Sequence, residues 1–296
     1  MRLSAQPLDF RKDYEAMALT NVLEILQDAD SKNRGVVGFN TMNFEEVAWI
    51  IETAEEEGVP VIIMLHPYMS QYSMPFYAHA QMTRALAEQV KVPVGLHLDH
   101  SESFDEVMRA IQAGFTSVMI DGSQMRFEEN VALTAAVCRV AKAIGVVVEG
   151  ELGRIGLASN EDDFMDKSLF TKPEDAVAFI EKTGVDSLAV AIGSAHGHYV
   201  REPKLDLDRL REINAATETP LVLHGGSGIP DEQLLEAAKN GINKLNVGTE
   251  YGHLFYKHTE ELIGNGKTRE DWMWCMDALK PLMKAYIRQK LHILGY

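Results

Sequence analysis

The 296-residue sequence is poor in cysteine, in basic residues and in long apolar runs, and each shortage excludes a class of protein. Only Cys138 and Cys275 are present, far apart, so we expect no disulfide framework and no cysteine-based zinc site. Lys and Arg number 28 against 44 Asp and Glu, a formal charge of −16 that argues against nucleic-acid binding. No apolar run approaches the ~18 residues of a membrane span. The first residues lack the apolar segment of a secretory signal, so we expect a cytoplasmic protein.

Short runs rich in Val, Ile and Leu alternate with stretches of helical period. The runs lie at 36–40, 60–65, 93–100, 117–123, 146–153, 187–193, 220–228 and 244–250. Their nearly continuous apolar character is typical of strands buried on both faces of a parallel sheet. Eight strand–helix units in about 250 residues predict an α/β fold, a (β/α)8 TIM barrel, with a doubly wound open sheet as the alternative. We expect one domain spanning 1–296, with the barrel at about 35–250 and a C-terminal helical extension at about 252–293.

Several helix starts are marked by capping residues. Asn43 is predicted to cap a helical stretch, with Glu46 three positions later. Ser103 is predicted to cap another helix, with Glu106 completing a capping box. Pro230 is expected at the first position of a later helix. The segment 154–172 has no helical period, and a loop of that length in a compact domain is usually functional or disordered.

Polar residues cluster where the apolar runs end. The clusters are His97-Leu-Asp99-His100, Asp121-Gly-Ser123, Glu149-Gly-Glu151, Ser194-Ala-His196-Gly-His198, His224-Gly-Gly-Ser-Gly228 and Asn246-Val-Gly-Thr-Glu250. In a barrel the C-terminal ends of all strands meet at one face, which is where active sites lie. The sequence therefore predicts a site built from these clusters.

Three of the histidines come from three different run ends, namely His100, His196 and His224. Three neutral imidazoles with an open fourth position are typical of catalytic zinc. Each one alone could be a hydrogen-bonded core histidine, but three together favour a metal site. Strand alternation places His97 on the same face as Asp99, so one of His97 and His100 has a different task, and periodicity does not decide which.

Carboxylates accompany these histidines. Beside a metal, Asp99 would stay ionised and could exchange a proton with a hydroxyl group, or it could orient a histidine ligand. Asp121 and Glu151 are interpreted either as carboxylates that hydrogen-bond to the metal ligands or as alternative metal ligands. Glu149 and Glu151 could instead form an inward ion pair at the rim of the barrel.

Gly225-Gly-Ser-Gly228 and Asn246-Val-Gly-Thr249 follow the seventh and eighth runs, where barrels commonly bind phosphate through backbone N–H groups and a helix N-terminus. The alternative for the first motif is a tight turn. A metal, a phosphate site and a proton-transferring aspartate together suggest an enediolate reaction, in which a neighbouring carbon–carbon bond breaks or forms.

At this point the motifs resemble one family, the class II zinc-dependent ketose-phosphate aldolases. LHLDH, MIDGS, VEGELGR, LAVAIGSAHG, PLVLHGGSG and LNVGTE occur in the order of that family. The resemblance covers the chain from Gly35 to the C-terminal helix and is nearest to the tagatose-bisphosphate and 5-keto-2-deoxygluconate-6-phosphate aldolase branch. It implies a lyase of carbohydrate metabolism that reversibly cleaves a ketose phosphate to dihydroxyacetone phosphate and an aldehyde.

The resemblance also implies roles for individual residues. The zinc ligands would be His100, His196 and His224, with Asp121 and Glu151 at a second location, and Asp99 would be the acid/base for the hydroxyl proton. The dihydroxyacetone-phosphate site would comprise Asn40, Gly197, Gly225, Gly226, Ser227, Asn246, Val247, Gly248 and Thr249. For some members a monovalent cation, Na⁺ or K⁺, near the phosphate loop is implied as well, and the family forms homodimers and homotetramers.

The chain departs from the family pattern in the loop after the fifth run. This loop usually continues ELG-x-x-GG and carries a Glu that exchanges the carbon proton, whereas here the second Gly is missing and the loop is longer. Glu161 is the best candidate for that role, with Asp162 and Asp163 as alternatives. No Lys ends a strand, since Lys91 and Lys244 stand where the third and eighth runs begin, so a Schiff-base mechanism is not expected.

Two further departures concern the substrate. Met273 stands where bisphosphate-cleaving members place an Arg for the far phosphate, which argues against a bisphosphate substrate, with fructose- or tagatose-1,6-bisphosphate aldolase proper as the alternative. His66 and His198 replace residues that are usually small or hydroxylated, and could contact an unusual aldehyde portion, such as a carboxylate or sulfonate, or lie at the surface or rim. A metal-dependent hydrolase is disfavoured because the first run, VVGFN, carries no His. A non-catalytic sugar-phosphate-binding protein is disfavoured because the three histidines and Asp99 are all present.

Overall fold

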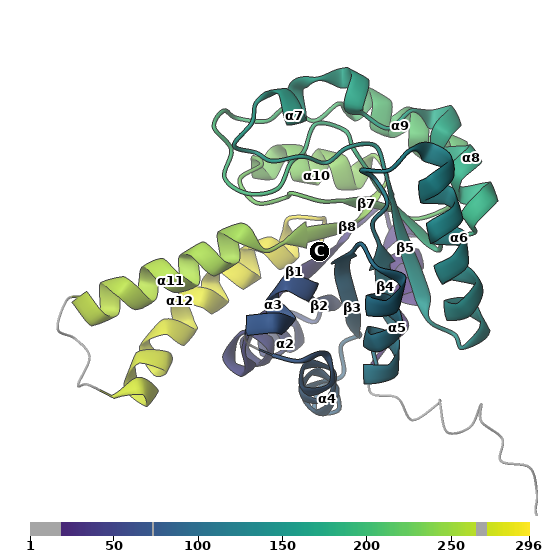
Figure 1. Ribbon diagram of the computed structural model, residues 1–296. Coiled ribbons are helices and arrows are strands. Elements are labelled where there is room, and N and C mark those ends of the chain that lie inside the picture. The colour runs from purple at the N-terminus through teal and green to yellow at the C-terminus, as the bar shows by residue number, and fades with distance from the viewer. Residues whose placement is uncertain (1–18, 73, 265–270) are drawn as a thin grey trace, which may run out of the picture.

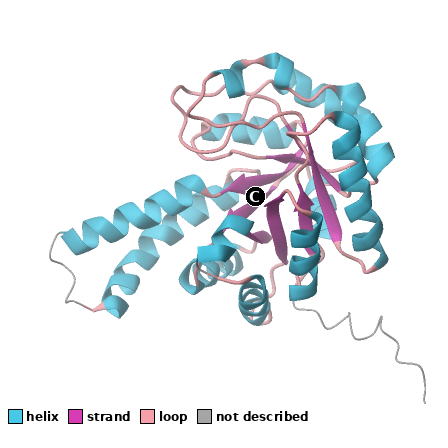
Figure 2. Cartoon of the chain, viewed as in Figure 1, coloured by secondary structure: helices cyan, strands magenta, loops and turns pink. Residues whose placement is uncertain are grey.

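The computed structural model describes residues 19–72, 74–264 and 271–296. Eight parallel strands close into a barrel in chain order, which confirms the predicted (β/α)8 fold and excludes the open sheet (Figures 1 and 2). The strands are β1 (Val36–Asn40), β2 (Val61–Leu65), β3 (Val94–Ser101), β4 (Ser117–Ile120), β5 (Val147–Leu152), β6 (Ser187–Val190), β7 (Leu221–Leu223) and β8 (Ile242–Val247). Each overlaps one of the apolar runs, because a strand buried on both faces tolerates few polar positions.

Helices surround the barrel; the first precedes the first strand, the last two follow the last strand, and the others connect successive strands. They are α1 (Val22–Asp30), α2 (Phe44–Glu57), α3 (Pro67–Tyr72), α4 (Phe76–Ala87), α5 (Phe104–Ala113), α6 (Phe127–Ala143), α7 (Asp162–Met165), the 3₁₀ turn η1 (Lys167–Leu169), α8 (Pro173–Thr183), α9 (Leu207–Ala216), α10 (Asp231–Lys239), α11 (Thr249–Gly264) and α12 (Trp272–His292). The segment after β5 therefore contains short helical turns that its sequence does not reveal. In the described part of the chain, no helix is both long and apolar enough to cross a membrane.

The capping predictions have mixed outcomes. Asn43 caps α2 as expected, since its side chain accepts from the N–H of Glu46. The predicted box at Ser103 is wrong, because its hydroxyl caps nothing and the Glu106 carboxylate accepts from Ser101 Oγ instead. Pro230 lies one residue earlier than predicted, at the N-cap of α10.

Helix α1 closes the end of the barrel where the strands begin. Its buried face packs against apolar residues of β1 and β2; the cluster comprises Val22, Ile25, Leu26, Ala29, Val36, Ile62 and Met64. Gly95 permits this approach, because a Cβ there would lie 2.8 Å from a methyl group of Val22. With that end covered, the opposite end, formed by the C-terminal ends of the strands, remains for a site.

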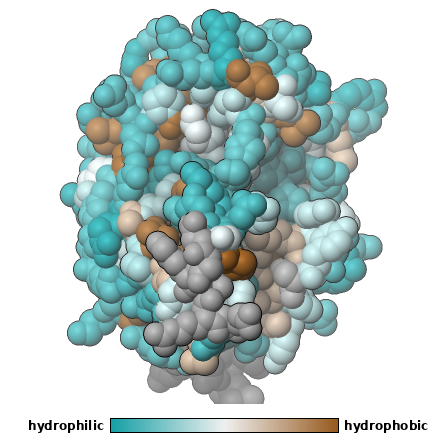
Figure 3. Space-filling model, turned by 90° about the vertical axis from the view of Figure 1, so that its left-hand side faces the viewer, coloured by the Kyte–Doolittle hydropathy of each residue, from teal (hydrophilic) through white to brown (hydrophobic). Residues whose placement is uncertain are grey.

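The C-terminal helices α11 and α12 pack against each other and extend beyond the barrel as an arm (Figure 1). Ion pairs fasten α12 to α2, including Lys284 with Glu52 and Glu56. The arm exposes several large apolar side chains, namely Tyr256, Ile263, Trp272, Met273 and Leu282. The view along the arm shows a mostly hydrophilic surface with isolated apolar patches (Figure 3). Met273 thus stands on the exposed surface of the arm.

Candidate active site and metal centre

A cavity of about 540 Å³ opens at the C-terminal ends of the strands. Its lining comprises Asn40, His66, Met69, Asp99, His100, Glu102, Asp121, Gln124, Ile155, His196, Gly197, Gly225, Ser227, Asn246, Gly248, Thr249, Gly252 and His253. Residues from loops or ends of all eight strands therefore meet here, as the barrel topology predicts.

A backbone irregularity in β3 brings two consecutive side chains to this cavity. The register between β3 and β4 shifts between Leu98 and Ser101, and His100 adopts a positive φ of 42°. Asp99 and His100 consequently both face the site, which strict alternation along a strand would forbid. His97 instead lies fully buried inside the barrel, where its Nδ1 contacts Ser117 Oγ at 2.7 Å. The question that periodicity left open is thus resolved by the bulge.

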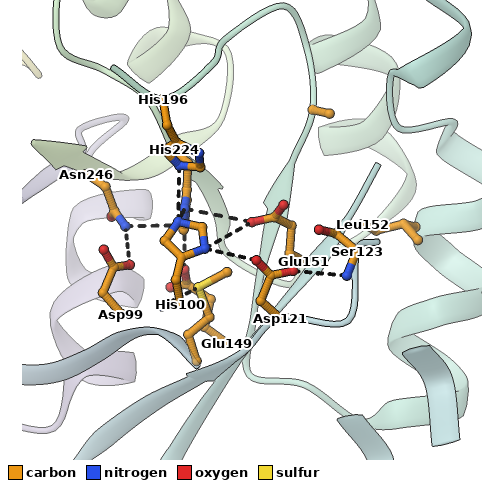
Figure 4. A network of polar contacts seen from close by, with 12 residues as sticks. Asp99, His100, Asp121, Ser123, Glu149, Glu151, Leu152, His196, His224 and Asn246 are labelled. Carbon is orange, nitrogen blue, oxygen red and sulfur yellow. Dashed lines mark hydrogen bonds and ion pairs between the residues drawn. The ribbon is translucent and has the colours of Figure 1, made fainter. Parts of the chain in front are cut away.

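The three predicted histidines converge beside the cavity, which His100 and His196 line while His224 is fully buried behind them (Figure 4). Nε2 of His100 lies 3.1 Å from Nε2 of His196 and 2.7 Å from Nδ1 of His224. The other ring nitrogens of two of them are held from behind: Asp121 lies 3.0 Å from His100 Nδ1, and Glu149 lies 2.8 Å from His224 Nε2. A carboxylate on the far nitrogen orients an imidazole and makes it a better ligand, so this donor set fits a zinc ion.

A second possible donor set shares one of these histidines. His100, Asp121 and Glu151 also offer atoms within 4.8 Å of one another. Oε2 of Glu151 is buried and has no hydrogen-bond partner among the described residues. It lies 3.9 Å from His100 Nδ1. Burial, with the nearby charge of Asp121, raises the pKa of Glu151 well above its usual range. A buried carboxylate oxygen without a hydrogen-bond partner suits a cation.

Below the histidines, Glu149 forms a buried ion pair with Lys244. The Lys244 Nζ lies 2.7 Å from Glu149 Oε2, and both side chains are at most 1% exposed. Burial alone would raise the pKa of Glu149, but Lys244, His97 and His224 together outweigh it and hold that pKa well below the usual range. The inward ion pair that the sequence suggested therefore exists for Glu149, deep in the barrel, while Glu151 has no such partner.

Asp99 is fixed by two amides beside the histidines. Its two carboxylate oxygens accept hydrogen bonds from Asn40 Nδ2 at 2.7 Å and Asn246 Nδ2 at 2.9 Å. Burial opposes ionisation, yet the neighbouring His100 and His224 hold the pKa of Asp99 well below its usual range. Burial likewise would lower the pKa of His100, but Asp99 and Asp121 raise it to about 10. Asp99 is therefore a carboxylate at neutral pH, with both oxygens oriented.

The glycine-rich turns after β6, β7 and β8 form one end of the cavity. Gly225 has φ of +65°, and a Cβ there would lie 2.2 Å from the carbonyl oxygen of Ala195, so only glycine fits. Thr249 begins α11, whose N-terminus lies beside Gly197, Gly225 and Ser227 in the lining. Of the residues expected to bind dihydroxyacetone phosphate, Gly226 and Val247 are buried and do not line the cavity. Exposed backbone N–H groups at a helix N-terminus suit a phosphate.

The loop after β5 lies over one side of the cavity. Ile155 lines the cavity, while Glu161 is outside it, in an ion pair with Arg201 at 2.7 Å. Asp163 supports the loop from within, since its Oδ2 accepts from the N–H of Leu157 at 2.9 Å. Backbone hydrogen bonds also join the loop to the segment around His196. In this conformation the side chain proposed to transfer the carbon proton does not line the cavity.

Sequence reasoning missed several lining residues. Glu102 and Gln124 lie just beyond the ends of β3 and β4, where position alone could have indicated them. His253 lies one turn into α11, and its ring contacts that of His198 with centroids 5.2 Å apart. His66 lines the cavity itself, whereas His198 is exposed at its edge. No spacing in the sequence links His198 to His253, because the contact depends on where α11 begins.

Comparisons with known proteins place the chain in a family. The family model "Fructose-bisphosphate aldolase class-II" matches residues 20–296. A fructose-bisphosphate aldolase of Staphylococcus epidermidis is 39% identical over 282 residues, covering 94% of this chain and 98% of the relative. One from Staphylococcus aureus is 38% identical over the same length and coverage.

A solved structure is also similar. The YdjI aldolase from Escherichia coli K12 superimposes with a TM-score of 0.84 at 31% identity, covering 94% of this chain and 97% of that one. The family match spans nearly all of the chain, and two independent kinds of similarity agree with it. The chain therefore belongs to the class II fructose-bisphosphate aldolase family, and it is an aldolase, a carbon–carbon lyase.

Proposed function

We propose that the enzyme reversibly cleaves a ketose phosphate to dihydroxyacetone phosphate and an aldehyde, with zinc as its metal. The observation that carries this proposal is the convergence of His100, His196 and His224 beside the ionised Asp99, in a cavity with glycine-rich turns at one end. Zinc held by these imidazoles would polarise the substrate ketone and stabilise the enediolate. Asp121 and Glu151 offer the second location for the ion.

The residues of this chain divide the remaining tasks. Asp99 takes the proton of the hydroxyl group on the carbon that becomes the aldehyde, and returns it in the condensation direction. Asn40 and Asn246 keep its two oxygens in place through their amide donors. The backbone N–H groups near Gly225 and Thr249 bind the phosphate, which fixes the substrate relative to Asp99.

Proton exchange at carbon is assigned to Glu161. Asp163 is already engaged in holding the loop through Leu157 and Asn160, so its replacement would disturb the loop itself. Among the described residues, the side chain of Glu161 is held by an ion pair with Arg201, in which the Glu161 side chain is 48% exposed and that of Arg201 is 62% exposed. Exposed pairs are worth at most about 1 kcal/mol, so this one opposes a swing of the loop into the cavity only weakly. Asp162 is the remaining alternative.

Two accompanying features are proposed on the same basis. A monovalent cation, Na⁺ or K⁺, would bind near the phosphate turns and offset the charge of the substrate phosphate. The exposed apolar residues of the arm support assembly into a homodimer or homotetramer.

A coupled assay for dihydroxyacetone phosphate release tests the proposal. Fructose and tagatose 1,6-bisphosphates and several ketose monophosphates are compared before and after treatment with EDTA, and again after zinc is restored. We expect that EDTA abolishes the release and that zinc restores it. Borohydride added with the substrate should not inactivate the enzyme, because no Schiff base forms. The relatives named fructose-bisphosphate aldolase favour the second candidate, a bisphosphate-cleaving enzyme, and zinc-dependent release from a bisphosphate would support it.

A further inference from the structure

The cavity has two ends of different chemistry, with the histidines between them. The glycine-rich turns that follow β6, β7 and β8 form the phosphate end. Residues that follow β2, β3 and β4 form the other end, namely His66, Met69, Glu102 and Gln124. A ketose phosphate anchored by its phosphate and passing the histidines must place its aldehyde half at this second end.

The second end has no Lys or Arg for another phosphate among the residues that the structure describes. Neither Lys nor Arg occurs among the residues that line the cavity. Glu102 is exposed at this end and forms no hydrogen bond or ion pair with the described residues. Proteins usually bind phosphate groups with Arg or Lys as well as backbone donors, so an anionic tail would meet an acidic group without compensation.

His66 offers a donor suited to a hydroxyl group. Its Nδ1 accepts a hydrogen bond from the N–H of Tyr68 at 3.1 Å, which assigns the proton of the neutral ring to Nε2. Its ring centroid lies 5.9 Å from that of His100, next to the reacting region. Nε2 of His66 makes no hydrogen bond with any residue that the structure describes, so it is available to substrate.

We infer that the substrate is a ketose monophosphate whose aldehyde half is an uncharged hydroxyaldehyde, selected by His66 and Glu102. The inference rests on the proposed function. His66 donates to a hydroxyl oxygen of the aldehyde half, and Glu102 disfavours a second phosphate by charge repulsion. Both residues determine specificity and take no part in breaking the carbon–carbon bond.

The condensation direction tests this selection. Zinc-loaded enzyme and dihydroxyacetone phosphate are combined with glyceraldehyde, erythrose or threose, and separately with glyceraldehyde 3-phosphate. We expect a higher kcat/KM for an uncharged aldehyde. Glu102→Gln should raise the ratio of kcat/KM for phosphorylated over uncharged glyceraldehyde about three- to tenfold, as expected for removing one partly screened charge. The matched control is Glu218→Gln, at the opposite end of the barrel and exposed, which should leave the ratio unchanged.

Two substitutions test whether His66 acts through its Nε2–H hydrogen-bond donor. His66→Phe should raise KM for the uncharged aldehyde about tenfold at unchanged zinc content, while His66→Gln, which keeps an N–H donor, should restore most of it. A wild-type preference for the phosphorylated aldehyde would overturn the inference, as would equal effects of Glu102→Gln on both aldehydes.

A separate readout distinguishes failure of the proposed function. The enzyme should exchange a carbon-bound proton of dihydroxyacetone phosphate with solvent D₂O in the absence of any aldehyde. Loss of both this exchange and condensation would contradict the proposed function. Exchange without condensation of any uncharged hydroxyaldehyde would overturn the inference alone.

Discussion

Replacing Lys244 by methionine tests the buried charge network below the metal centre. Lys244 and Glu149 lie 2.7 Å apart with essentially no exposure, and Glu149 in turn holds Nε2 of His224. Removing one partner of a buried pair leaves an uncompensated charge, which costs about 3–5 kcal/mol. At about 2 °C per kcal/mol for a chain of this size, the melting temperature should fall by roughly 5–10 °C.

Thermal unfolding of EDTA-treated protein measures this effect without a contribution from metal binding. Lys280→Met is the matched control, because it breaks a surface pair with Glu52 whose side chains are 38% and 42% exposed. That pair should be worth less than about 1 kcal/mol. Lys244→Met combined with Glu149→Gln should recover part of the loss, since no unpaired charge remains. Equal shifts for the buried and surface variants, or a double variant worse than the sum of the single ones, would refute the reasoning.

Further predictions concern catalysis and pH dependence. Asp99→Asn should lower kcat/KM about 10²- to 10⁴-fold at unchanged zinc content, and a loss below tenfold in the coupled assay would contradict its acid–base role. Glu161→Gln should slow proton exchange of dihydroxyacetone phosphate about 10²-fold without changing the melting temperature, whereas Asp163→Asn should lower the melting temperature; the reverse pattern would assign the proton to Asp163. Burial raises the pKa of Glu46 from its ordinary 4.5 to about 7. The protonated form is therefore favoured in the folded state, and the stability it contributes is present below pH 4.5 and lost as the pH rises through 7. Glu46→Gln should abolish this loss, so that the free energy of unfolding of the variant, relative to wild type, is higher at pH 8.5 than at pH 5 by roughly 3 kcal/mol. Thermal unfolding at the two pH values measures this, and the same change in stability with pH for both proteins would disprove it.

The barrel could be predicted from the sequence because its signals are repeated and local. Eight apolar runs at regular intervals predict the strands. Because the C-terminal ends of barrel strands meet at one face, the sequence also predicted that His100, His196 and His224 lie close together. Capping was less predictable, since the carboxylate of Glu106 accepts a hydrogen bond from the Ser101 hydroxyl rather than completing a capping box with Ser103.

Other parts of the site depend on contacts between distant residues. Which of His97 and His100 faces the site depends on the bulge in β3, and no pattern of residue types in the sequence predicts that bulge. The position of Glu161 depends on its pairing with Arg201, forty residues away in the chain. The sequence placed Lys244 near the start of a strand, far from the predicted active site. Inside the barrel, however, Lys244 contacts Glu149, which in turn contacts His224.

Exchange of the carbon-bound proton of dihydroxyacetone phosphate with D₂O, followed by proton NMR, tests the central claim most directly. It needs no aldehyde, so it is independent of the identity of the substrate. We predict exchange with the zinc-loaded enzyme, loss of exchange after EDTA or in His196→Ala, and recovery when zinc is returned to the wild-type protein. Exchange that is undiminished after the metal is removed, or no exchange by fully zinc-loaded enzyme, would contradict the account.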